Sequence, residues 1–175
     1  GRDTANLFLP QSIDLFPQSA QNENLYLWLA AYFAHVPVSP ITEPDPLRAD
    51  LLKLQRAHET VRAVLDAAPG LGPIYSDLCS SLAILRPSRR LPRQEAQVEQ
   101  LILAMLGAGQ DVATLGSIPS VVDATASALS GYQTFLPVPL WGEAWLRSPS
   151  PAGTAPDDLP QQANSPAAGD SRKRR

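Results

Sequence analysis

Large apolar residues recur at intervals of three and four along residues 19–35, with polar residues between them. They are Leu25, Trp28, Leu29, Tyr32 and Phe33, continued by Val36. This spacing places them on one face of an α-helix, and a face with so much aromatic surface must be buried. We therefore expect this helix to form the centre of the core. Ser19 is the expected N-cap residue, and Pro37 ends the helix.

The clearest helical pattern follows Asp45-Pro46 and runs to residue 68. Aspartate is favoured at the N-cap and proline at the first helical position. Leucines and valines form one face of this helix. Charged residues, among them Asp50, are assigned to the opposite face, and Pro69-Gly70 ends the helix.

Two shorter helices are predicted at 73–85 and 92–106. The apolar face of the first is assigned to Ile74, Leu78, Leu82 and Leu85. The apolar face of the second is assigned to Val98, Leu101, Ile102 and Met105, with Glu99 directed outward. A weaker pattern predicts a fifth helix at 121–129, with Ser120 as its cap and Gly131 as its C-terminal stop.

The segment 135–145, FLPVPLWGEAW, alternates prolines with large apolar residues. Proline fixes its own backbone and lacks a donor, so this pattern favours an extended chain that is not a central strand. We predict an ordered strap lying over the helices, anchored by Trp141 and Trp145. The fold class is all-α: an irregular multi-helix bundle at 1–146, with this Pro/Trp strap, followed by a disordered linker or tail at 147–175.

Composition narrows the function classes. A net charge of −3 and a pI near 5.3 argue against a nucleic-acid-binding module, and no apolar run is long enough to span a membrane. The single cysteine, Cys79, excludes an internal disulfide and a cysteine-based metal site. We expect Cys79 to be a small core residue in a reduced, cytoplasmic protein.

No pattern in the chain predicts catalysis or cofactor binding. Asp123, Thr125 and Ser127 spell D-x-T-x-S, which resembles the metal-ion-dependent adhesion site of von Willebrand factor A domains. The apolar run before it is too short for the buried strand that such a site follows, so we interpret the match as chance. His35 and His58 have no third ligand at a suitable spacing, and no metal site is predicted.

Arginines surround the proline-bounded turn that joins the helices predicted at 73–85 and 92–106. They are Arg86, Arg89, Arg90 and Arg93. Guanidinium groups bind carboxylates through two parallel hydrogen bonds, so these residues are candidates for gripping an acidic partner surface. A solvated interhelical loop explains them at least as well. The terminal basic run at 172–175 is interpreted as a feature of the tail.

Five stretches together resemble the N-terminal helical region of the bacterial NorD/CbbO-type proteins. They are SIDLFP at 12–17, ENLYLWLAAYFAH at 23–35, DPLRADLLKLQRA at 45–57, PGLGPIYSDLC at 69–79 and FLPVPLWGE at 135–143. The resemblance implies a cytoplasmic protein with a von Willebrand factor A domain beyond residue 175, so that 147–175 becomes an interdomain linker. It also implies a MoxR-type AAA+ ATPase as partner. One branch of the family activates nitric oxide reductase, and the other remodels inhibited Rubisco.

The leading hypothesis is therefore a non-catalytic adaptor that docks an ATPase ring or its target enzyme complex, with no cofactor in this segment. The alternative is a small ligand-binding or enzymatic domain with an aromatic-lined pocket, formed by Trp28, Tyr75, Trp141 and Trp145. A third reading is a dimerisation domain, which a large exposed apolar patch would support.

Overall fold

The computed structural model describes residues 5–107 and 127–142, and within these ranges the chain is helical and contains no β-strand. The α-helices there are α1 (Ser19–His35), α2 (Pro46–Ala67), α3 (Gly72–Leu85) and α4 (Arg93–Met105). Two 3-10 turns, η1 (Pro69–Leu71) and η3 (Pro139–Trp141), complete the regular structure of these residues. The all-α prediction is confirmed, and the predicted bounds of these helices agree closely with those observed.

The beginnings of α1 and α2 differ in how they are capped. The carboxylate of Asp45 accepts a hydrogen bond from the backbone N–H of Arg48 at 3.0 Å, as the sequence predicts. The N-cap of α1 is Gln18 and not Ser19, which is the first helical residue and donates its hydroxyl to Glu23. The prediction for Ser19 was wrong by one position.

Asn22 fixes the chain that enters α1. Its side-chain oxygen accepts hydrogen bonds from the backbone N–H groups of Leu15 and Phe16, at 3.0 and 2.9 Å. Its amide group donates to the carbonyl oxygen of Phe16 at 2.8 Å. Phe16 is thereby held in the core, where it is almost fully buried.

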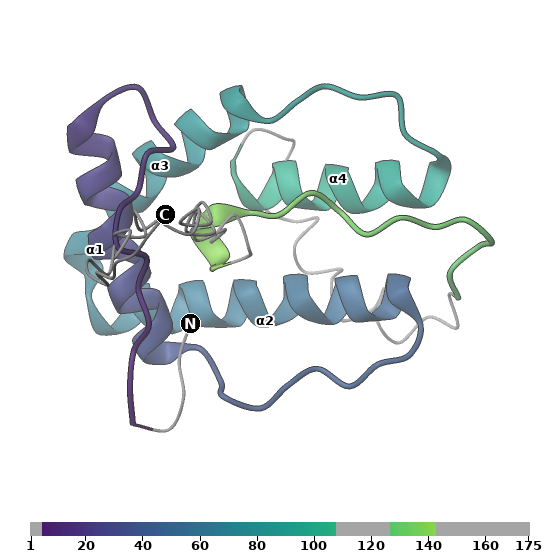
Figure 1. Ribbon diagram of the computed structural model, residues 1–175, viewed down its shortest axis with the longest axis horizontal. Helices are drawn as coiled ribbons and strands as arrows, with labels where there is room; N and C mark the ends of the chain where they lie inside the picture. Colours follow the sequence, from purple (N-terminus) through teal and green to yellow (C-terminus); the bar gives the residue numbers. More distant parts are fainter. Residues whose placement is uncertain (1–4, 108–126, 143–175) are drawn as a thin grey trace, which may run out of the picture.

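Residues 127–142, which we call the return segment, run between α2 and α4 (Figure 1). The segment ends at η3, where it contacts α1, and α1 packs against both α2 and α3. Figure 1 shows α1 crossing one end of α2. It also shows α2 on one side of the return segment and α4 on the other. The return segment therefore contacts α1, α2 and α4, while Gln133 and Thr134 remain exposed.

The core contains the aromatic face of α1, as predicted, together with apolar residues from the other helices and the return segment. Its largest fully buried side chains are Trp28, Leu25, Leu29, Leu51, Leu54, Leu78, Ile102, Leu140, Val64, Val98 and Val138. Two assignments were wrong. Leu85 ends α3 with 47% of its surface exposed, and Asp50, expected on the charged face of α2, is fully buried.

The strap prediction was correct in placing an ordered segment against the helices, and residues 135–138 form no helix, but 139–141 differ from it. Val138, Leu140 and Trp141 are buried, so this end of the segment belongs to the core, whereas Phe135 and Leu136 are half-buried. The backbone also turns into η3, because proline suits the first position of a helical turn as well as an extended chain.

Several predictions fall outside the described residues, among them the disordered segment 147–175, Trp145 and most of the helix at 121–129. Within that helix, 127–129 have no helical structure, so the prediction is wrong for those three positions. Among the helices described, none combines the length and apolar character needed to cross a bilayer.

Candidate partner-binding surface

Arg86 differs from the other three arginines because its side chain is buried. Its side chain is only 4% exposed, and it forms a two-point ion pair with Glu99 of α4: Nε lies 2.5 Å from Oε1 and Nη2 lies 3.0 Å from Oε2. Nη2 also donates to the carbonyl oxygen of Leu136 at 3.0 Å. Arg86 therefore links the end of α3 to α4 and to the return segment. Its charge is balanced by that of Glu99 inside the protein. Glu99, predicted to face outward, is its partner.

Arg89, Arg90 and Arg93 are exposed. Arg89 and Arg90 line a pocket of about 270 Å³ between the α3–α4 loop, α4 and the return segment. The remaining lining residues are Leu91, Pro92, Glu95, Val98, Glu99, Gly131, Tyr132, Gln133, Thr134 and Phe135. Arg86 and Arg93 are not among its lining residues, and the sequence gave no indication that the return segment would form its opposite wall.

The acidic groups of this pocket are already engaged. Glu99 is paired with Arg86, and Glu95 accepts a hydrogen bond from the backbone N–H of Gln133 at 3.2 Å. Arg89 and Arg90 therefore place two positive charges at the rim, in a chain whose net charge is −3. The pocket is a local basic site in an acidic protein.

Asp50 of α2 holds the pocket wall in place from behind. Its Oδ2 accepts hydrogen bonds from the hydroxyl of Tyr132 at 3.0 Å and from the backbone N–H of Phe135 at 3.2 Å. Its Oδ1 pairs with the ammonium of Lys53 at 2.9 Å. Burial, followed by the charge of Asp50, raises the pKa of Tyr132, so the phenol stays protonated and donates.

The burial of Asp50 could have been predicted from the sequence. Asp50 lies three residues after Leu47 and four before Leu54, which is the spacing of the buried face. Its assignment to the charged face followed residue type and overlooked this position. Its partners on the return segment could not be found in this way, because they lie more than 80 residues away.

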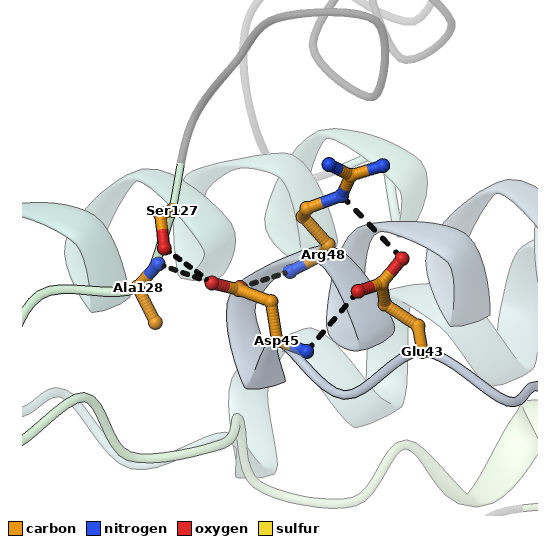
Figure 2. A network of polar contacts seen from close by, with 5 residues as sticks. All are labelled: Glu43, Asp45, Arg48, Ser127 and Ala128. Carbon is orange, nitrogen blue, oxygen red and sulfur yellow. Dashed lines mark hydrogen bonds and ion pairs between the residues drawn. The ribbon is translucent and has the colours of Figure 1, made fainter.

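Asp45 anchors the beginning of the return segment (Figure 2). Its Oδ2 accepts hydrogen bonds from the hydroxyl of Ser127 at 2.6 Å and from the backbone N–H of Ala128 at 2.8 Å. The bond from Ser127, then those from the N–H groups of Arg48 and Ala128, lower the pKa of Asp45 from 3.8 to about 2. Ser127 is the last residue of the D-x-T-x-S match, whose Asp123 and Thr125 lie outside the described residues.

Three of the four aromatic residues proposed to line a ligand pocket contact one another instead, and the fourth, Trp145, lies outside the described residues. The rings of Trp28 and Tyr75 stack with their centroids 4.2 Å apart, and the indole N–H of Trp141 donates to the hydroxyl of Tyr75 at 3.3 Å. These side chains fill the space that a ligand would need. The alternative of an aromatic-lined ligand site is not favoured.

Cys79 is buried beside this aromatic cluster, as expected for a small core residue. Burial raises the pKa of its thiol to about 11, which suppresses the reactive thiolate. His35 ends α1, and its Nδ1 lies 2.9 Å from the carbonyl oxygen of Ala31. Partial burial lowers the pKa of His58. In the described part of the chain, no three metal-ligating side chains come together.

The described residues thus define an all-α domain with a basic-rimmed pocket. No family model and no solved structure matches the sequence. The proteins NorD of Brucella abortus and Brucella melitensis are each 39% identical to it over 168 residues, 95% of this chain and 26% of each relative. The NorD protein of Stutzerimonas stutzeri is 31% identical over 105 residues, 59% of this chain and 15% of that protein. The chain is homologous to NorD proteins and spans about a quarter of the length of the Brucella relatives.

Proposed function

We propose that this chain is the non-catalytic helical adaptor region of a cytoplasmic NorD-type accessory protein that activates nitric oxide reductase. The observation that carries the proposal is 39% identity to NorD proteins over 95% of the chain. Because the named relatives are NorD proteins, nitric oxide reductase is favoured over the Rubisco target of the CbbO branch. We assign the von Willebrand factor A domain, and its metal site, to a part of the protein outside this chain.

The proposed partner is a MoxR-type AAA+ ATPase. The ATPase hydrolyses ATP, and the adaptor passes the resulting conformational work to the target enzyme complex. A rigid helical body suits this role, because a loosely packed one would absorb the displacement. The bonds from Asp45, Asp50, Arg86 and Trp28 to the return segment support such rigidity.

The proposed docking surface is the basic rim formed by Arg89 and Arg90, with Arg93 beside it. Arg86 is left out of this surface because its guanidinium is buried against Glu99. Among the residues that the structure describes, none forms an ion pair with Arg89, Arg90 or Arg93, so these side chains can bind an acidic surface without first breaking such a pair. This makes them better docking residues than Arg86.

Overproducing the 175-residue chain in a denitrifying cell that retains its own full-length protein tests the proposed function. The chain should compete for the ATPase or the target and reduce nitric oxide reductase activity in membranes. The triple variant R89E/R90E/R93E should relieve this inhibition. The matched control R62E, which reverses an exposed arginine on α2, should inhibit as the unaltered chain does.

Unchanged reductase activity in the presence of abundant folded chain would contradict the adaptor role. Circular dichroism of the purified variants establishes that each is folded. Immunoblots establish that the chain accumulates and that the level of the reductase subunits stays constant, so that the assay reports activation and not synthesis.

A further inference from the structure

We propose that the pocket between Arg89, Arg90 and the return segment is a docking site for an acidic peptide segment of a partner protein. One apolar side chain of the peptide enters the pocket, and carboxylates on either side of it bind the two arginines. The assignment of this peptide to the ATPase or its target rests on the proposed function, whereas the binding chemistry rests on the pocket alone.

The interior of the pocket suits an apolar side chain. Its walls include Leu91, Val98 and Phe135, which are buried or half-buried. The volume of about 270 Å³ lies below the roughly 300–1,000 Å³ of typical small-molecule sites. A whole cofactor would not be enclosed, but the side chain of a docking residue would be.

The rim supplies the charge. Arg89 and Arg90 are adjacent and exposed, while Glu99 is neutralised by Arg86 and Glu95 is engaged by the backbone of Gln133. A carboxylate that reaches Arg89 and Arg90 meets two exposed guanidinium groups, and the charge of Glu99 nearby is already balanced by Arg86. Charge-assisted hydrogen bonds to arginine are the strongest class available at such a surface.

The same features argue against nucleic acid as the occupant. A phosphate backbone needs a run of basic contacts, and this chain offers two arginines at the pocket in a protein of net charge −3. A short acidic peptide with an apolar residue satisfies both the rim and the interior.

Fluorescence anisotropy with the peptide Glu-Asp-Leu-Glu-Asp, labelled with fluorescein, tests the site on the full chain. Two control peptides separate the contribution of the carboxylates from that of the apolar side chain. Gln-Asn-Leu-Gln-Asn removes the carboxylates, and Glu-Asp-Ser-Glu-Asp removes the apolar side chain. We expect each control peptide to bind at least about tenfold more weakly than the acidic peptide. We also expect the affinity of the acidic peptide to fall as the salt concentration is raised.

Variants of the chain test whether the peptide binds in the pocket. R89E/R90E should weaken binding by more than about tenfold, because two charge-assisted hydrogen bonds are replaced by repulsion. T134W should also weaken it, because Thr134 is an exposed wall residue whose replacement obstructs the pocket without disturbing the core. R62E is the matched control and should bind as the unaltered chain does. Thermal unfolding establishes that each variant is folded.

Three results would overturn the docking site: no binding of the acidic peptide, equal binding of all three peptides, or equal loss in R62E and R89E/R90E. The assay contains neither ATPase nor reductase, so these outcomes leave the adaptor role standing. Conversely, peptide binding with no inhibition of reductase activation in cells would overturn the proposed function and leave the docking site intact.

Discussion

The indole N–H of Trp28 donates a hydrogen bond to the carbonyl oxygen of Leu140, 2.8 Å away in space and 112 residues away in sequence. Both side chains are fully buried. The bond joins the middle of α1 to η3 and gives the carbonyl oxygen of Leu140 a donor inside the core. It makes the return segment part of the core that α1 organises.

Replacing Trp28 by Phe should lower the free energy of unfolding by about 2–4 kcal/mol. The change leaves the Leu140 carbonyl without its donor and removes ring volume from the stack on Tyr75. Urea denaturation followed by circular dichroism measures the loss. The matched control Y26F, at a half-exposed tyrosine of the same helix, should change stability by less than about 0.5 kcal/mol. Equal stability of W28F and Y26F would show that the buried bond contributes nothing.

The ion pair of Arg86 and Glu99 should depend on both partners. E99Q leaves the guanidinium, only 4% exposed, without its counter-charge and should cost about 2–4 kcal/mol. R86M/E99L removes both charges and should be more stable than E99Q, because no buried charge is left unpaired. E59Q, at an exposed glutamate on α2, is the control in the same urea titration. If R86M/E99L proved less stable than E99Q, loss of the contacts of Arg86 would cost more than leaving its charge unpaired, and this reasoning would be wrong.

Two glycines with positive φ offer a matched test of packing at the end of the return segment. Gly142 has φ 71° and Gly131 has φ 86°, so alanine at either site should cost about 1–2 kcal/mol through its backbone alone. A Cβ at Gly142 would also collide with the ring of Phe33, whereas a Cβ at Gly131 meets no atom within 4 Å. G142A should therefore be less stable than G131A by a further 1–3 kcal/mol or so. Equal thermal stability of the two would contradict the close contact between Gly142 and Phe33.

Asp45 should make the stability of the chain depend on pH in acid. Its pKa in the folded protein, about 2, lies below the ordinary 3.8, so its contribution is present above pH 3.8 and is lost as the pH falls toward 2. D45N retains the helix cap but cannot titrate. The urea midpoint of D45N should therefore fall less steeply between about pH 4 and pH 2 than that of the unaltered chain. Parallel slopes would show that the bonds from Ser127 and Ala128 do not favour the ionised carboxylate.

The helices could be predicted from sequence because their signals are local. The aromatic face of α1 repeats every three to four residues, and Asp45-Pro46 marks the start of α2 within two positions. Nothing beyond a few neighbouring residues is needed to recognise either. The same local analysis wrongly assigned Asp50 to the charged face of α2. It gave more weight to residue type than to the position of Asp50 on the buried face.

The contacts that shape the pocket could not be predicted, because they join residues far apart in the chain. Arg86 reaches Leu136 across 50 residues, and Tyr132 reaches Asp50 across 82. A cluster of arginines in sequence does not reveal which one is buried against a glutamate and which remain at the surface. Only the packing of the return segment between α2 and α4 separates Arg86 from Arg89 and Arg90.

Binding of the purified 175-residue chain to a purified MoxR-type ATPase, the partner proposed above, tests the adaptor role most directly. Biolayer interferometry with and without nucleotide measures it. We expect saturable binding that R89E/R90E/R93E weakens by about tenfold or more and that R62E leaves unchanged. Absence of binding by the folded chain in every nucleotide state would contradict the account.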